Sequence, residues 1–226
     1  GDRIHAIGSL GGAYTNVQGL NNQGVVVGES EDAAEPFSEI RAFWWTVDGG
    51  MRALPGSSVS RAEDVNDEGL IVGLTPAEGV SARAVRWDMA GTVTPLGPLP
   101  LSLSEALGIN NDGVSVGFAD VPGGSIHATV WDRAGNVTDI GTLGGNGAIA
   151  LYINERSQVA GVADTPANDN ESGFFWSARD GMVPIPARGG GSRLVAALND
   201  QGEVVGDTTV SERSAAYLWT RRRGLV

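Results

Sequence analysis

Three kinds of residue in this 226-residue chain could carry chemistry: a serine in a hydrolase-like motif, two histidines and a set of carboxylates. Residues 113–117 read Gly-Val-Ser-Val-Gly, which matches the turn that presents a nucleophilic serine in hydrolases. That turn must join a strand to a helix. Ser115 instead takes the position that Val26, Ile71 and Val204 hold in similar segments, in the middle of a predicted strand. We therefore interpret Ser115 as a strand residue and predict no catalytic serine.

The histidines and one acidic segment are the candidate metal ligands of this sequence. His5 and His127 are the only histidines, so a three-histidine zinc site is impossible, and the absence of cysteine excludes thiolate sites. Residues 164–171 read DTPANDNE, but they lack the spacing and central glycine of a calcium-binding loop. We interpret His127 as structural and residues 164–171 as a solvated loop, and we expect no metal and no cofactor.

The elements that must position any site come from an internal repeat. The pattern Asn-x-x-Gly-x-x-x-Gly recurs every 44 or 45 residues, and a Trp follows each copy. The repeated residues are Asn21, Asn66, Asn110, Asn154 and Asn199, with Trp45, Trp87, Trp131, Trp176 and Trp219. Five copies of one unit fill the chain. A unit of this size cannot bury its apolar face alone, which predicts one domain of stacked units.

Each unit is interpreted as four short strands. In the third copy, residues 105–110, 114–118, 127–131 and 137–140 are β-rich and separated by turn residues. Successive four-stranded meanders predict an all-β fold, a five-bladed β-propeller of four-stranded antiparallel blades. A single domain over residues 1–226 would have blades at about residues 13–56, 57–100, 101–143, 144–187 and 188–226 plus 3–10. The Trp residues, being in strict register, are predicted core positions.

The two ends of the chain suggest how the ring closes. Residues 4–12 align with residues 137–145 of the third copy, and the fifth copy stops at residues 224–226, in the middle of its fourth strand. We predict that the N-terminal strand completes the last blade and closes the propeller, which removes exposed sheet edges. An open β-solenoid is the rival architecture.

One face of the predicted propeller varies more than the other. The connections between the second and third strands, and those between units, differ in length and composition, whereas the other turns are uniformly tight. Binding residues concentrate on variable loops of a rigid scaffold, so this face is the candidate site. Near the channel mouth on this face we place six candidate ligand-binding residues: Gln18, Arg61, Glu63, Glu105, Tyr152 and Arg193. A hydrated, salt-bridged rim without a ligand is the plain alternative.

The repeated unit resembles the HAF repeat of bacterial extracellular repeat proteins. The closest segments are residues 143–145 (Leu-Gly-Gly), residues 106–117, and residues 127–131 (His-Ala-Thr-Val-Trp). The triplet at the start of the third strand departs from His-Ala-Phe in the other copies, as in Arg41-Ala42-Phe43. The resemblance implies an exported, propeller-like protein and assigns no catalytic residues.

These observations lead to three functional hypotheses. The leading one is a non-catalytic interaction or ligand-binding β-propeller, exported to the periplasm or the extracellular space, with a cytoplasmic location as the alternative. The second is a glycan-active hydrolase or lyase in which Glu63 and Glu105 serve as acid and base. The third is a small-molecule enzyme with an apolar pocket walled by Leu107, Leu151 and Tyr152.

Composition limits the partners. The net charge of −12 argues against nucleic acid, because phosphate backbones would be repelled. The sequence has no apolar run long enough to insert into a membrane. We expect a monomer that binds an unidentified ligand, with a glycan or a small molecule possible.

Overall fold

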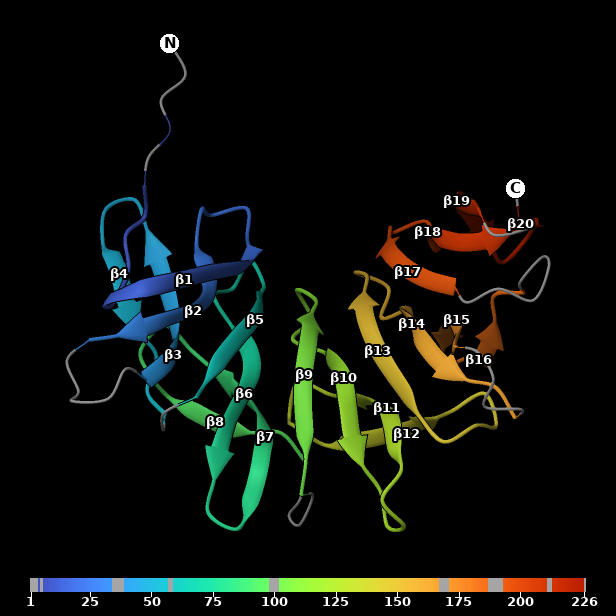
Figure 1. Ribbon diagram of the computed structural model, residues 1–226, viewed down its shortest axis with the longest axis horizontal. Helices are drawn as coiled ribbons and strands as arrows, with labels where there is room; N and C mark the ends of the chain where they lie inside the picture. The colour runs from blue at the N-terminus through green and yellow to red at the C-terminus, as the bar shows by residue number, and fades with distance from the viewer. Residues whose placement is uncertain are drawn as a thin grey trace.

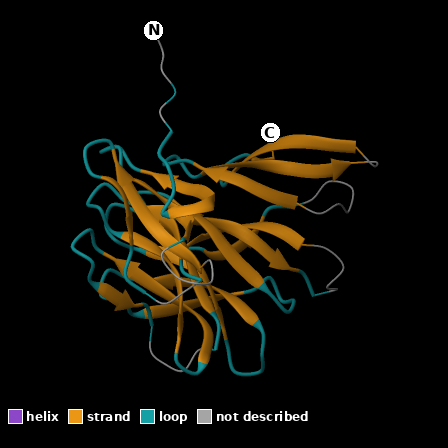
Figure 2. Cartoon of the chain, turned by 60° about the vertical axis from the view of Figure 1, so that its left-hand side comes forward, coloured by secondary structure: helices purple, strands orange, loops and turns teal. Residues whose placement is uncertain are grey.

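The computed structural model describes residues 4, 6–33, 39–56, 59–97, 102–166, 171–186, 193–210 and 213–225. Over these residues the chain forms five antiparallel sheets of four strands each, and no helix (Figures 1 and 2). The same residues therefore include no helix of the length and hydropathy that crossing a membrane requires. The all-β, four-stranded design predicted from the repeat is confirmed.

Each sheet contains four strands that are consecutive in the chain. The first sheet contains β1 (Gly11–Leu20), β2 (Val26–Asp32), β3 (Glu39–Thr46) and β4 (Gly50–Ala53). The second contains β5 (Arg61–Val65), β6 (Ile71–Ala77), β7 (Val80–Trp87) and β8 (Val93–Pro95). The third contains β9 (Ser104–Ile109), β10 (Ser115–Asp120), β11 (Ile126–Trp131) and β12 (Val137–Gly141). The fourth contains β13 (Ala148–Ile153), β14 (Val159–Asp164), β15 (Glu171–Ser177) and β16 (Gly181–Pro184). The fifth contains β17 (Arg193–Leu198), β18 (Glu203–Val210), β19 (Arg213–Thr220) and β20 (Gly224–Leu225).

A β-bulge interrupts the first strand of every sheet at the same repeat position. The pairing of β5 with β6, for example, shifts between Ala62 and Asp64, which leaves Glu63 without a partner in the ladder. The closing glycine of the motif lies opposite this bulge. A Cβ on Gly73 would clash with the backbone carbonyl of Arg61, and the equivalent glycines face equivalent carbonyls. The bulge therefore explains why each copy has glycine in the middle of its second strand.

The tight Asn-x-x-Gly turns form as predicted. The glycine of the third copy, Gly113, has a positive φ of 77°, which glycine adopts without steric cost. The fourth copy has Ser157 at this place, and it keeps a positive φ of 53°. In the same copies, Asn110 and Asn154 accept hydrogen bonds from nearby backbone amides and so fix the turn.

Neighbouring sheets pack face to face around apolar clusters, one at each of the four junctions. Trp87, Trp131 and Trp219 are buried in these clusters, which confirms them as core residues. Trp176 is half-buried against the third cluster. Trp45 is also half-buried, and among the described residues no other sheet packs on its side of the first sheet. The core thus lies between the sheets, and the four junctions set the curvature of the molecule.

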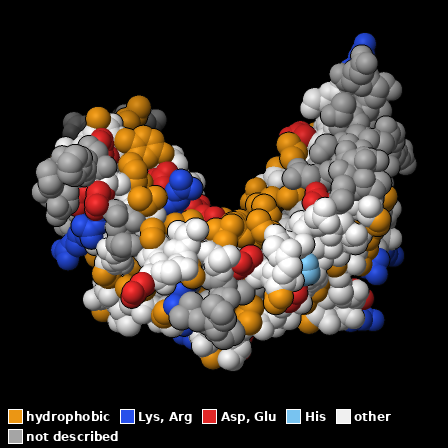
Figure 3. Space-filling model, turned by 60° about the horizontal axis from the view of Figure 1, so that its bottom comes forward, with side chains coloured by type: hydrophobic (Ala, Val, Ile, Leu, Met, Phe, Trp, Pro, Cys, Tyr) orange, Lys and Arg blue, Asp and Glu red, His pale blue; other side chains and the backbone are white. Residues whose placement is uncertain are grey.

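The five sheets form an open arc, and the described residues do not show the predicted ring closure. Figures 1 and 3 show the first and fifth sheets at opposite ends of the arc, with a deep opening between them. The fourth strand of the fifth sheet is β20. Ile4 is fully exposed, and the described residues 6–10 form no strand; His5 lies outside the described residues. The position proposed for the N-terminal strand is therefore already occupied in part by the chain's own C-terminal strand.

Candidate functional site

The first three sheets bring a cluster of charged side chains together on the concave side of the arc. Tyr14 on β1 donates a hydrogen bond from its hydroxyl to Glu29 Oε1 at 2.9 Å. Glu29, on β2, is buried, and its Oε2 lies 2.9 Å from Nε of Arg61 on β5. This contact neutralises a carboxylate that would be costly to bury alone.

Glu63 and Glu105 form the second half of this cluster. The bulge in β5 presents Glu63 toward β9, where its carboxyl group shares a hydrogen bond with that of Glu105. Burial, the charge of Glu105 and this hydrogen bond raise the pKa of Glu63 to about 7, partly offset by the positive charge of Arg61. Burial also raises the pKa of Glu105. The pair therefore holds a proton to a higher pH than a free glutamate does.

The pH dependence of stability tests this shared proton. The pKa of Glu63 in the folded protein, about 7, lies above its ordinary 4.5, so the folded state binds more protons between these pH values. Its contribution to stability is then present below about pH 4.5 and is lost as the pH rises through 7. A Glu63→Gln variant keeps a donor toward Glu105 without a charge. At pH 8 we expect it to be more stable than the parent by about 1–2 kcal/mol, allowing for solvent screening.

The measurement is thermal unfolding of both proteins at half-unit steps from pH 4.5 to 8. The difference in Tm should grow with pH and level off above 7.5. Glu78→Gln, in the exposed turn between β6 and β7, is the matched control and should follow the parent curve. Parallel curves for the parent and Glu63→Gln would show that the two carboxyl groups do not share a proton.

The other candidate residues lie in different surroundings. Gln18 is exposed on β1, and none of the hydrogen bonds found among the described residues joins it to the cluster. Tyr152 packs, half-buried, against the apolar cluster between the fourth and fifth sheets. Arg193 begins β17, and its side chain lies outside the described residues. The structure thus brings Arg61, Glu63 and Glu105 together, but not the whole predicted set.

Sequence reasoning missed Glu29, the partner of Arg61, and Tyr14, which donates a hydrogen bond to Glu29. Glu29 directly follows the closing glycine, where the next three copies have Leu74, Phe118 and Val162. The available signal was a carboxylate at a position that is apolar in these three copies, although the fifth copy also has one there, Asp207. The sequence offered no signal for Tyr14, since its role depends on how β1 pairs with β2.

The concave side continues beyond the charged cluster as an apolar surface. The positions equivalent to Glu63 and Glu105 in the later sheets carry aliphatic side chains that are half-buried or exposed, and Figure 3 shows apolar atoms along this part of the opening. These residues are Leu107, Ile149, Leu151, Leu194 and Ala196. The concave side therefore has a charged half and an apolar half.

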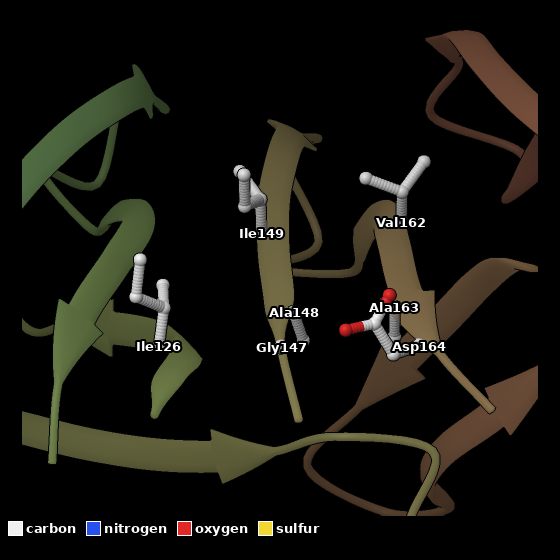
Figure 4. Close-up of a pocket in the computed structure, with 7 residues that line it drawn as sticks. All are labelled: Ile126, Gly147, Ala148, Ile149, Val162, Ala163 and Asp164. Carbon is white, nitrogen blue, oxygen red and sulfur yellow. The ribbon is translucent and has the colours of Figure 1, made fainter. Parts of the chain in front are cut away.

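A small pocket lies between the third and fourth sheets, at the face with variable loops (Figure 4). It has a volume of about 120 Å³ and opens onto a shallower depression of about 470 Å³. Figure 4 shows Ile126 and Asp164 on either side of the start of β13, at Gly147 and Ala148. The pocket is too small for a drug-sized ligand, but with the depression it offers space for part of one.

Ser115 and His127, two candidates from the sequence, both lie in strands. Ser115 is fully buried in β10, so the hydrolase-like motif lies in a strand, as predicted. His127, on β11, contacts Asp139 on β12, with Nδ1 2.8 Å from Oδ2. In the described part of the chain, no group of three or more His, Asp or Glu side chains is placed to hold a metal ion.

Comparison with known proteins adds information on the fold. TolB from Acinetobacter baumannii is similar with a TM-score of 0.63 and 14% identity, covering 92% of this chain and 52% of that chain. The putative TolB from Agrobacterium tumefaciens is similar with a TM-score of 0.64 and 11% identity, covering 93% and 78%. The acylaminoacyl peptidase from Pyrococcus horikoshii has a TM-score of 0.51 and 11% identity, covering 90% and 38%.

This chain therefore spans about half the length of the Acinetobacter protein. At such identities the likeness shows the fold alone, and that fold is propeller-like. No family model matches the sequence, and no curated protein matches it.

Proposed function

We propose that this chain is a non-catalytic, propeller-like interaction or ligand-binding module. It binds through the face that carries the variable loops and through the adjoining concave side. The resemblance of its repeat to HAF repeats supports a place in the periplasm or outside the cell. The ligand is a glycan or a small molecule with a polar part and an apolar part.

The mutual closeness of the Glu63 and Glu105 carboxyl groups, together with the ion pair between Arg61 and Glu29, carries this proposal. Glycosidases hold their two carboxyl groups about 5–10 Å apart, because a sugar, and in one class a water, must fit between them. Two carboxyl groups that interact as closely as these leave no such space. Arg61 is likewise engaged by Glu29. Because these charged groups interact with one another, their arrangement favours a binding surface and not a catalytic acid–base pair.

The binding surface has two adjoining parts. The depression next to β11, β13 and β14 offers backbone and carboxylate oxygens at Gly147 and Asp164. On the concave side, Ile149 and its aliphatic neighbours offer apolar contact. A ligand that lies across both would present hydroxyl groups to the first and an apolar face to the second.

A binding screen with paired variants tests the proposal. Oligosaccharides and small organic acids are screened by thermal shift, and hits are measured by calorimetry. Ile126→Arg fills the depression, so we expect it to weaken binding of a hit by roughly tenfold or more. Ala134→Arg, in the exposed turn on the opposite face, should bind as the parent does.

Two results would contradict this function. One is a hit whose affinity is the same in Ile126→Arg as in the parent, which would remove the depression from the site. The other is turnover of a glycan that Glu63→Gln abolishes, because that result would establish the carboxyl groups as catalytic.

A further inference from the structure

The junctions between sheets are joined by two repeating sets of hydrogen bonds as well as by apolar packing. In the first set, the side-chain amide of each motif Asn donates to the backbone carbonyl of the next motif Asn. Its distances are 2.8, 3.0, 3.2 and 2.8 Å along the arc, from Asn21 to Asn199. In the second set, the backbone amide of the residue after each motif Asn donates to the side chain at that position in the next unit, at 2.8–3.0 Å.

In both sets the donor lies in one unit and the acceptor in the next unit along the chain. The fifth sheet therefore has donors, and the first sheet acceptors, that no neighbouring unit matches. At the fifth sheet, the Asn199 side-chain amide donates to Glu203 in its own turn at 2.8 Å. The equivalent amide of Asn154 makes that local bond to Gln158 and also bonds to the next unit. Asn199 therefore retains a second proton that could be donated to a following unit. At the first sheet, the carbonyl of Asn21 is the corresponding acceptor.

The apolar faces at the two ends are exposed where equivalent residues are buried. On the first sheet, Val17 and Leu20 are 49% and 67% exposed, whereas the equivalent Ala62 and Val65 of the second sheet are 0% and 4% exposed. On the fifth sheet, Val205 is 40% exposed. The four side chains equivalent to it are fully buried in the junctions: Val27, Val72, Val116 and Ala160. The two ends thus carry the two complementary halves of one more junction.

Residues 4–12 identify what belongs in the opening. They match residues 137–145, which form the last strand of the third unit and the link to the fourth. The fifth sheet already has its own fourth strand, β20, and in the repeat register Leu225 and Ile4 hold the same position. By their register, residues 4–12 are therefore the end of a unit that precedes the first sheet.

We propose that the opening between the fifth and first sheets accepts one further copy of this repeat unit, in the same polypeptide, that ends in residues 4–12. Its motif Asn accepts from Asn199 and donates to Asn21. The residue directly after it is an Asn, Asp or Glu. Its side chain accepts a hydrogen bond from the backbone amide of Asp200, and its backbone amide donates to the side chain of Asn22. A small residue four positions before the Asn packs over Val205, as Ala62 packs with Val27 at the first junction.

Closure of the five sheets on themselves is the less favourable alternative. All four junctions already have both sets of hydrogen bonds at normal length and a packed core. Bringing the ends together would require each junction to rotate further, which would break those bonds and the close packing. An added unit fills the opening and leaves every junction as it is.

The test compares the 226-residue chain with an extended chain. The extension is a second copy of residues 102–136, joined directly to Ile4, because Ile4 holds the register of Val137. We expect the extended chain to gain about 5 °C or more in Tm. We also expect amide hydrogen exchange in β1 and β18 to slow by about tenfold or more as these strands become covered. Solution scattering should show a closed ring.

The matched control carries the same extension with Asn110→Ala and Ala106→Glu in the added copy only, and it should show none of these gains. Three results would overturn the proposal. The intact extension could leave Tm and exchange unchanged. The 226-residue chain could itself scatter as a closed ring. It could also form a stable head-to-tail dimer that Leu20→Asp dissociates, and the occupant would then be a second copy of the chain.

Discussion

Trp87→Ala should lower the free energy of unfolding by about 3–5 kcal/mol, the range for removal of a large buried aromatic side chain. Trp87 is fully buried at the junction of the first and second sheets. Its indole Nε1 also donates to the carbonyl of Pro55 at 2.7 Å, so the substitution leaves a carbonyl without its partner as well as a cavity. Urea unfolding followed by circular dichroism measures the loss.

Trp45→Ala is the matched control, because Trp45 holds the same repeat position in the first sheet, where no other sheet of the described residues packs against it. It is only half-buried, and we expect less than about 2 kcal/mol of destabilisation there. The contrast separates the packing at a junction from the packing within one sheet. Equal losses for the two variants would show that the register of the Trp residues reflects the sheet alone.

Asn66→Ala should destabilise the protein by about 2–4 kcal/mol, because it removes three hydrogen bonds from a buried position. The side-chain amide of Asn66 donates to the carbonyl of Asn110 at 3.0 Å. Its Oδ1 accepts from the amides of Glu68 and Leu70 at 3.1 and 2.9 Å. Asn66 thus holds its own turn and joins the second sheet to the third.

Asn199→Ala tests the same chemistry at the open end of the arc. Asn199 makes equivalent bonds within its turn, but it is exposed and donates to Glu203 of the same turn. Water can replace these bonds, so we expect a loss of about 1 kcal/mol or less. A loss as large as that of Asn66→Ala in the same urea experiment would place the effect in the turn and not in the junction.

The open arc has a consequence for the proposed binding surface. The charged cluster of Tyr14, Glu29 and Arg61 lies on the first two sheets, and the first sheet borders the opening (Figure 1). A further unit placed there would border this cluster and complete the channel mouth. The ligand screen is therefore informative on both the 226-residue chain and the extended chain.

The local structure of each unit could be predicted from the sequence because it depends on local interactions. Alternation of apolar residues and Asn-Gly turn chemistry act over a few residues, and strands such as β10 and β12 lie within two residues of their predicted bounds. The convergence of Arg61, Glu63 and Glu105 could also be predicted from the sequence. Arg61 and Glu105 hold the same repeat position on neighbouring first strands, and Glu63 lies two residues after Arg61, on the same side of its strand.

The sequence by itself therefore determined the five units, their strands and turns, and the side of each first strand that faces the channel. Only the tertiary structure decided three further matters: the pairing of Glu63 with Glu105, the recruitment of Glu29 and Tyr14, and the open arc. Each depends on how one sheet is placed against another. The bulge aims Glu63 across a junction, and the opening is the sum of four junction angles, which side-chain volumes and the hydrogen bonds from Asn21 to Asn199 set together.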